Sequence, residues 1–381
     1  MLPKRKEEKH MEKMTHKQRI MNAIACERVD RTAYNNFDGG LLGRWADPEF
    51  CPGDMYLRPE WAMDKVIEGS LKMGGDTMPN LQYSPLMCID LTGIYYLTPG
   101  KEIGSDMCPQ AVEPDNMKPE HYDYILENGP EAWFKEFVEP GWEKFMPDFE
   151  KGLAVMEEFT KRCEKTGENW VSFNGVYNYG GPLYLSCTRG FTNFFKDIRK
   201  MPEKVKKAAE LINKWEIEKM TEQDVGRESV EIYQSALARF DGDQLSQEKF
   251  DEFIWPSYKY YNDMLEGTDI INEYHVDGNF TDNLGRHIKE LRPKKTIIQF
   301  DGFTNHEVFA DELVKHQICV YGDIPAAMLT NGEPEEVYNR VIWLKKLYGP
   351  GLWLGSGCGT PYNTKFENIQ AFIEAAETNN Y

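Results

Sequence analysis

Short apolar segments of β-forming composition alternate with helical segments along most of the chain. A helical pattern follows each candidate strand, because a crossover helix must return the chain to the start of the next parallel strand. Eight such units predict an α/β fold of the (β/α)8 barrel type. A doubly wound open sheet is the competing fold, and it is disfavoured because no glycine-rich dinucleotide turn follows the first strand. The candidate strands lie near positions 33, 77, 171, 231, 271, 298, 319 and 353.

The chain is predicted to form one domain over residues 15–381, preceded by a flexible charged leader at residues 1–14. T-x-x-Q and T-x-x-E boxes, starting at Thr15 and Thr364, are expected to cap the first and last helices, and Ser246 is the expected N-cap of a helix reaching about residue 265. Residues 41–58 are rich in Gly, Pro and aromatic residues and are expected to form a loop. The β-like runs at 88–91 and 94–97 predict an inserted hairpin within residues 85–125.

Polar side chains begin where the apolar strands stop. In a barrel these positions surround the active site, because catalytic groups lie at the carboxyl ends of the strands. The ring of candidates comprises Asn36, Asp38, Asn174, Tyr177, Gln234, His275, Asp277, Asp301, Asp323 and Cys358.

Three members of this ring have the chemistry of a zinc site. His275 and Asp277 are two positions apart at the end of a strand, so both side chains can point the same way. Cys358 follows the last strand, which in a barrel closes against the first. Imidazole, carboxylate and thiolate all ligate zinc, and three protein ligands leave a fourth position for substrate or water. The alternative is a His–Asp hydrogen bond beside an unrelated cysteine.

The remaining histidines are interpreted as non-functional. Residues 287, 306 and 316 fall in polar helical stretches and are expected at the surface, and His121 is expected in a loop. His10 and His16 belong to the leader and the first cap. Asp241 and Asp243 are interpreted as loop turn residues.

Composition limits the possible partners. The net charge of −19 repels nucleic acid and anionic lipid, and no cluster of basic residues offsets it. No stretch is long and apolar enough for a transmembrane helix, and the charged start lacks the apolar core of a signal peptide. A cytoplasmic protein is therefore expected, with no nucleic-acid or membrane partner. The eight cysteines are expected to be mostly buried thiols rather than a disulfide framework.

The second half resembles the uroporphyrinogen decarboxylase superfamily, in particular its corrinoid-dependent methyltransferase branch. Residues 246–256 are similar to the family pattern S-x-E-x-F-x-x-F-x-x-P, and residues 275–279 are similar to H-x-C-G-N. Residues 321–329 resemble G-N-x-D-P-x-x-L, and residues 357–361 with 367–369 resemble G-C-G-x-P followed by E-N-I. These segments occur in the family's order, whereas the first half matches only in outline.

The resemblance implies zinc ligation by His275, position 277 and Cys358. This chain departs from the family pattern at 277, where aspartate replaces cysteine. Aspartate is a harder ligand that donates less charge than thiolate, so the ion should be a stronger Lewis acid. That property suits an ether or phenolic oxygen better than a thiol. The decarboxylase itself is less similar, because its arginine-rich segment after the first strand is here residues 35–44, with Arg44 alone.

The expected activity is a zinc-dependent methyl transfer from a small methylated compound to the Co(I) corrinoid of a partner protein. An aryl methyl ether is the favoured donor, because of Asp277 and an aromatic content of 13%. Transfer from methylcorrinoid to a thiol or pterin, a tetrapyrrole decarboxylase, and a non-catalytic binder remain alternatives. A homodimer is compatible with the sequence. The predicted catalytic residues are Asp301, Tyr177 and Asn174, and the predicted substrate-binding residues are Asn36, Asp38, Gln234 and Asp323.

Overall fold

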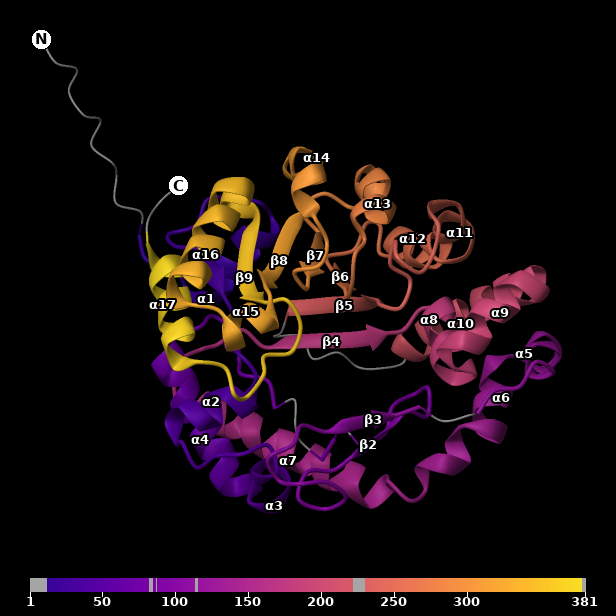
Figure 1. The fold of residues 1–381 in the computed structure, drawn as a ribbon, viewed down its shortest axis with the longest axis horizontal. Helices are drawn as coiled ribbons and strands as arrows, with labels where there is room; N and C mark the ends of the chain where they lie inside the picture. Colours follow the sequence, from indigo (N-terminus) through magenta and orange to yellow (C-terminus); the bar gives the residue numbers. More distant parts are fainter. Residues whose placement is uncertain (1–11, 82–84, 87, 114–115, 222–229, 379–381) are drawn as a thin grey trace, which may run out of the picture.

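The centre of the protein is one parallel sheet. A computed structural model describes residues 12–81, 85–86, 88–113, 116–221 and 230–378 (Figure 1). The strands are hydrogen-bonded in the order β1-β9-β8-β7-β6-β5-β4, and every pair is parallel. Their bounds are β1 (Ala33–Tyr34), β4 (Phe173–Asn178), β5 (Val230–Leu237), β6 (Ile271–Val276), β7 (Thr296–Phe300), β8 (Cys319–Ile324) and β9 (Leu352–Ser356).

Residues 76–80 join the two edges of this sheet. The Asp76 amide donates to the Tyr34 carbonyl on β1, and Asp76 and Met78 exchange backbone hydrogen bonds with Val171, just before β4. Single parallel bridges, Thr77 to Val171 and Asp38 to Asn80, replace a full ladder. The eighth strand expected near residue 77 is therefore present as a bridging segment, and the predicted (β/α)8 barrel is confirmed.

Helices surround the strands, as Figure 1 shows for α11 to α17 around β4 to β9. The Thr15 capping box is confirmed, and the Ser246 side chain accepts from the Lys249 amide as predicted. The helices are α1 (His16–Ile24), α2 (Gly39–Ala46), α3 (Asp54–Leu57), α4 (Pro59–Met73), α5 (His121–Asn128), α6 (Pro130–Phe137), α7 (Met146–Lys165), α8 (Gly181–Arg189), α9 (Phe191–Lys200), α10 (Pro202–Thr221), α11 (Gln247–Phe253), α12 (Trp255–Met264), α13 (Thr281–Leu284), α14 (Ala310–Lys315), α15 (Ala326–Asn331), α16 (Pro334–Tyr348) and α17 (Phe366–Glu377), with 3-10 turns η1 (Glu139–Trp142), η2 (Gly285–Glu290), η3 (His306–Phe309) and η4 (Gly349–Gly351).

Two local predictions were wrong. The expected loop at 41–58 contains α2 and α3. Gly43 in this segment allows close packing, because a Cβ there would lie 2.4 Å from the Phe50 ring. On α4, a Cβ at Gly69 would lie 2.0 Å from the Leu42 carbonyl. The T-x-x-E box is also absent. Helix α17 has Lys365 at its N-cap, and Thr364 is fully buried.

The inserted region packs beside the barrel mouth. Its hairpin pairs β2 (Tyr95–Leu97) with β3 (Gln110–Val112), while the expected pairing of the 88–91 and 94–97 runs is limited to a bridge between Ile89 and Tyr95. The Tyr179 hydroxyl donates to the Asp90 carboxylate at 2.7 Å, just after β4. This bond attaches the insertion to the carboxyl end of a barrel strand.

The barrel interior is apolar at one end and polar at the other. The layer nearer the amino ends of the strands is apolar and contains Ile232, Ile271, Ile297, Cys319 and Trp353. Helix α1 packs against this layer with Ile20, Ala23 and Ile24. The layers nearer the carboxyl ends are polar, because Gln234, Glu273, His275 and Gln299 occupy inward positions there. Among the described residues, none of the helices is long and apolar enough to span a bilayer.

Asp76 connects helix α1 to the closure of the barrel. Its carboxylate is fully buried and accepts hydrogen bonds from Arg19 at 2.5 Å, from Arg31 at 2.9 and 3.0 Å, and from the Tyr34 amide at 3.0 Å. His16 Nδ1 lies 2.7 Å away. Burial raises the pKa of Asp76, but the bonds to His16 and the arginines outweigh burial and lower the pKa overall.

We predict that Asp76→Asn lowers the free energy of unfolding by about 3 kcal/mol, because buried Arg19 loses part of its charge compensation. Denaturant titration at neutral pH measures this loss. Since the folded-state pKa of Asp76 is lowered, its contribution is present above about pH 4 and is lost as pH falls through the folded-state pKa. The difference between the two proteins should therefore shrink in acid.

The matched control is Asp269→Asn. Its carboxylate pairs with Lys295 at 2.9 Å on a fully exposed side chain, and such exposed pairs contribute little to stability. Equal effects of the two substitutions would contradict the role assigned to Asp76.

Candidate metal centre

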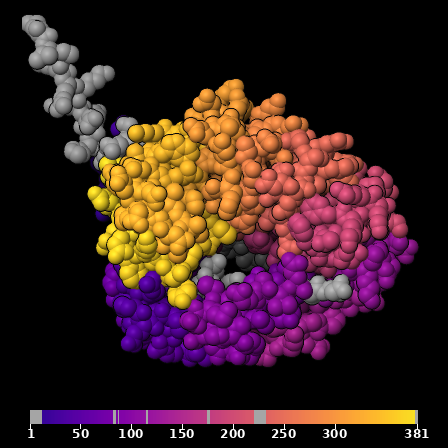
Figure 2. All heavy atoms as spheres, viewed as in Figure 1, coloured from indigo at the N-terminus to yellow at the C-terminus, as the bar shows by residue number. Residues whose placement is uncertain are grey.

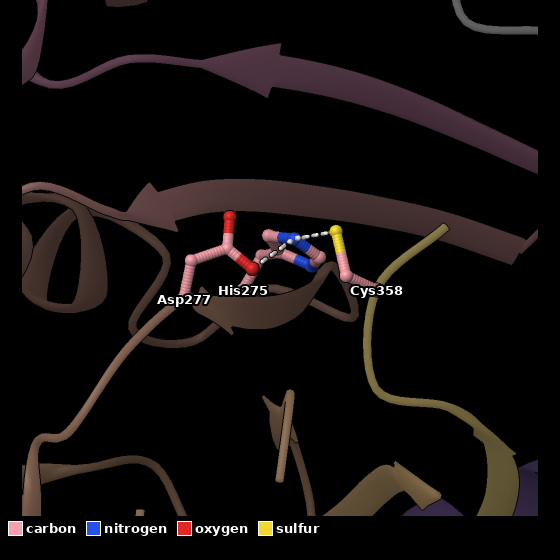
Figure 3. Close-up of side chains that lie close together, drawn as sticks. All are labelled: His275, Asp277 and Cys358. Carbon is pink, nitrogen blue, oxygen red and sulfur yellow. Dashed lines mark hydrogen bonds and ion pairs between the residues drawn. The ribbon is translucent and has the colours of Figure 1, made fainter. Parts of the chain in front are cut away.

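His275, Asp277 and Cys358 converge at the carboxyl end of β6, as Figure 3 shows. His275 Nε2 lies 3.2 Å from an Asp277 carboxylate oxygen and 3.7 Å from the Cys358 sulfur. The three donor atoms all lie within 4.8 Å of one another. The predicted grouping of these residues is therefore present, although Cys358 is 83 positions after His275.

The spacing of the donor atoms fits tetrahedral zinc. Zinc bonds of about 2.0–2.1 Å to nitrogen or oxygen and about 2.3 Å to sulfur separate neighbouring ligand atoms by about 3.3–3.6 Å. The two measured distances, 3.2 and 3.7 Å, lie close to this range. In addition, Asp277 Oδ1 is buried, and His275 Nε2 lies 3.2 Å from it. A buried carboxylate oxygen beside an imidazole nitrogen and a cysteine sulfur is suited to a cation, so these residues fit the ion.

Gln299 fixes the orientation of the imidazole. Its side-chain carbonyl contacts His275 Nδ1, which donates to it when the proton is on that nitrogen. This leaves Nε2 with a free lone pair directed at Asp277 and Cys358, the tautomer that a metal ligand requires. Register explains the contact, because Gln299 on β7 is paired with His275 on β6.

The electrostatics of the three residues are coupled. Burial lowers the pKa of His275, but hydrogen bonding to Asp277 and Cys358 outweighs it and raises the pKa well above the ordinary value. Burial raises the pKa of Asp277, while the hydrogen bond and charge of His275 lower it overall. In the absence of an ion, the imidazole thus has the partners that favour its protonated form, and zinc and a proton compete for the same nitrogen.

The loop that carries Cys358 is held on both sides. Ser356 donates to the Cys358 carbonyl at 2.5 Å, and the Thr360 hydroxyl donates to Ser356 at 2.9 Å. The Thr360 amide donates to the Asp38 carboxylate. Burial raises the pKa of Asp38 to about 6, although the bonds from Thr360 lower it. Asp38 therefore positions the cysteine loop.

Asp301 supports the opposite side of the centre. Its carboxylate accepts from the Gly278 amide at 2.8 Å, next to Asp277, and from the Phe303 amide at 3.1 Å. A Cβ at Gly357 would lie 2.4 Å from the Asp301 Cα, so only glycine lets the cysteine loop approach this closely. Burial raises the pKa of Asp301, and nearby Asp277 adds to the increase, while the two backbone bonds lower it.

A cavity of about 550 Å³ extends from His275 and Cys358 into the barrel. Figure 2 shows this face of the molecule hollowed between the C-terminal half and the inserted segments. Gln234 donates to the Glu273 carboxylate at 2.9 Å within the cavity wall. Burial raises the pKa of Glu273, although Gln234 and His275 lower it. Aromatic residues supply another part of the wall: Phe37, Phe173, Tyr321 and Trp353.

The other predicted site residues are bonded to the scaffold or lie beside the site. The Asn36 amide lines the cavity but bonds to the Thr77 carbonyl at 2.5 Å and to the Gly75 amide, so it helps to close the barrel. Asp323 is fully buried and bonds to His306 at 2.5 Å and to Arg340, so its carboxylate is engaged by the helical layer rather than the cavity. Tyr177 lies at the end of β4, paired in register with Gln234. The Asn174 side chain lies outside the described residues.

The predicted surface positions of His287 and His306 were wrong, and the predicted loop position of His121 was inexact. His287 is buried between Asp251 and Glu290, each 2.9 Å away, and His306 is buried between Asp323 and Tyr348. Three of their four partners lie 17 to 42 positions away in the sequence, so the local polar stretches gave no sign of burial. His121 begins α5 and is also buried, whereas His10 lies outside the described residues.

Sequence reasoning missed Gln299 and Glu273. Both occupy inward positions of otherwise apolar strands, two residues before Asp301 and His275 respectively. A period of two, counted back from the strand ends, would have found them, because alternate residues of a strand face the same side.

Comparison with known proteins places the chain in a family. The sequence model of the uroporphyrinogen decarboxylase (URO-D) family matches residues 179–379, more than half of the chain. The chain belongs to this family. A solved structure of a methyltransferase from Methanosarcina mazei is similar with a TM-score of 0.62 over 96% of this chain and 98% of that chain, at 15% identity, which shows a common fold. No curated protein sequence matches the chain.

We predict that the purified protein binds about one zinc ion per chain and that Cys358→Ala abolishes most of this binding, because two protein ligands hold zinc weakly. Gln299→Leu should weaken zinc binding by about 10- to 100-fold, since the imidazole loses its orienting bond. Metal analysis after dialysis against a graded chelator measures both effects.

Cys108→Ala is the control, since Cys108 is a half-buried cysteine of the insertion. Zinc retention by the Cys358 variant, or equal loss in the Cys108 variant, would exclude this centre.

Proposed function

We propose that the protein is a zinc-dependent methyltransferase that moves a methyl group from a small methylated compound to the Co(I) corrinoid of a partner protein. The observation that carries the proposal is the group of His275, Asp277 and Cys358 beside a cavity large enough for a small molecule. The fold that the chain has in common with a methyltransferase supports the same class of activity. An aryl methyl ether is the proposed donor.

The chain's own residues orient the metal ligands and the substrate. Gln299 and Asp301 fix His275 and the turn after Asp277, and Asp38 fixes the Cys358 loop. Phe173 and Trp353, with ring centroids 5.2 Å apart, offer an apolar wall to an aromatic ring. Zinc, when bound, would supply Lewis acidity to the oxygen that carries the methyl group.

Methyl transfer breaks the carbon–oxygen bond of the ether and forms a carbon–cobalt bond. The acceptor's Co(I) provides the electron pair, and the oxygen leaves as a phenolate. Negative charge therefore develops on the oxygen, and a site with a strong Lewis acid lowers the cost of that charge. Asp277 favours this direction, because a carboxylate neutralises zinc less effectively than a second thiolate.

The decarboxylase alternative is disfavoured by the wall of the cavity. An octa-acidic tetrapyrrole requires cationic partners, and among the described residues that line the cavity none is a lysine or arginine. Transfer to a thiol remains the second candidate, because His275 and Cys358 are two of the ligands that the thiol-activating relatives are expected to use.

The direct test is demethylation of 2-methoxyphenol by the zinc-loaded protein with cob(I)alamin, followed by the absorbance of methylcobalamin. We predict that Asp277→Cys retains zinc but lowers this rate about tenfold or more, because a softer ligand weakens the Lewis acid. The same variant should gain methylation of a thiol by methylcobalamin.

Asp243→Cys, the same change on an exposed loop, is the matched control and should leave both rates unchanged. A wild-type protein that methylates thiols but demethylates no methoxyarene would replace the proposed direction with its reverse.

A further inference from the structure

The cavity beside the metal centre has an acidic, acceptor-rich wall. Asp38 and Glu273 both line it, and the Glu273 side chain is almost fully buried. Gln234 adds an amide carbonyl group, because its amide nitrogen donates to Glu273, whereas the Gln299 carbonyl is engaged by His275. No lysine or arginine is found among the described lining residues.

Zinc would not offset this charge. Its two positive charges would be balanced by the Asp277 carboxylate and the Cys358 thiolate, so the metal with its ligands is neutral overall. An anionic group in the cavity would then lose its hydration without gaining a cationic partner, which is the costly case for a buried charge. Glu273 would add repulsion at short range.

A hydroxyl group has the complementary chemistry. It donates one hydrogen bond and accepts others, so it can donate to a carboxylate or amide oxygen of this wall. The Trp353 ring packs against Tyr321 with 4.4 Å between the ring centroids, and this extends the flat wall beside the polar groups.

We propose that this cavity selects uncharged methyl donors that carry a hydroxyl group, such as methoxyphenols, and excludes carboxylated ones, with Glu273 and Gln234 as the specificity-determining pair. The inference rests on the proposed function for the identity of the methyl donor. The charge selectivity itself rests on the cavity wall alone.

Calorimetric titration of the zinc-loaded protein at pH 7.5 tests the proposal with 2-methoxyphenol, which is neutral at this pH, and 4-methoxybenzoate, which is anionic. We expect the phenol to bind at least about tenfold more tightly. Glu273→Gln keeps the size of the side chain and the contact with Gln234, and should reduce the ratio of the two affinities about tenfold. Glu307→Gln, which removes an exposed carboxylate on η3, should leave the ratio unchanged.

Equal or tighter binding of 4-methoxybenzoate to the unaltered protein would overturn the proposal, and so would failure of 2-methoxyphenol to bind. This result needs no variant, so it stands even if Glu273→Gln does not fold. A folded Glu273→Gln protein with an unchanged ratio would remove Glu273 from the selectivity. Selective binding without methyl transfer would refute the proposed function alone, whereas efficient transfer from 4-methoxybenzoate would refute the selectivity alone.

Discussion

The parallel register of the barrel strands is the constraint on which the candidate site depends. Because β6, β7 and β9 run in the same direction, their carboxyl ends meet at one face of the molecule. The pairing of His275 with Gln299 follows directly from the register of β6 and β7. A one-residue shift of β6 against β7 would turn His275 away from the cavity, since alternate residues of a strand face opposite sides of the sheet. The candidate metal centre thus depends on backbone pairing as much as on its three proposed ligands.

Around the ligands, polar bonds replace the apolar packing found lower in the barrel. Asp38, Asp301 and Gln299 each bond to a ligand or to its loop. Buried polar groups are costly unless they are paired, and here the pairs also fix geometry. Asp38 and Asp301 therefore orient the ligand loops. Glu273 contacts neither loop, and we propose that it determines which ligands the cavity binds.

The barrel and the three-ligand group were predictable, because alternation and strand-end polarity survive in the sequence. The predictions that failed concerned single segments and side chains. The glycines of α2 looked like loop residues, yet they allow the close contact of Gly43 with Phe50. Asp323 sits at a strand end like the true mouth residues, but His306 and Arg340 from the helical layer hold it. Such partners are distant in sequence and leave no periodic signal. Gln299 and Glu273, in contrast, could have been predicted from the two-residue period of side chains in a strand.

The bond between the Thr360 amide and Asp38 joins positions 322 residues apart. This separation affects the order in which the barrel forms during translation. The first strand leaves the ribosome long before its partner β9 exists, so the half-formed barrel has an open edge until β9 has been synthesised. Cys358 emerges last of the ligands. At the proposed zinc site, metal capture would therefore be coupled to the pairing of β9, because a chain without Cys358 offers a histidine and an aspartate, a pair that holds zinc weakly.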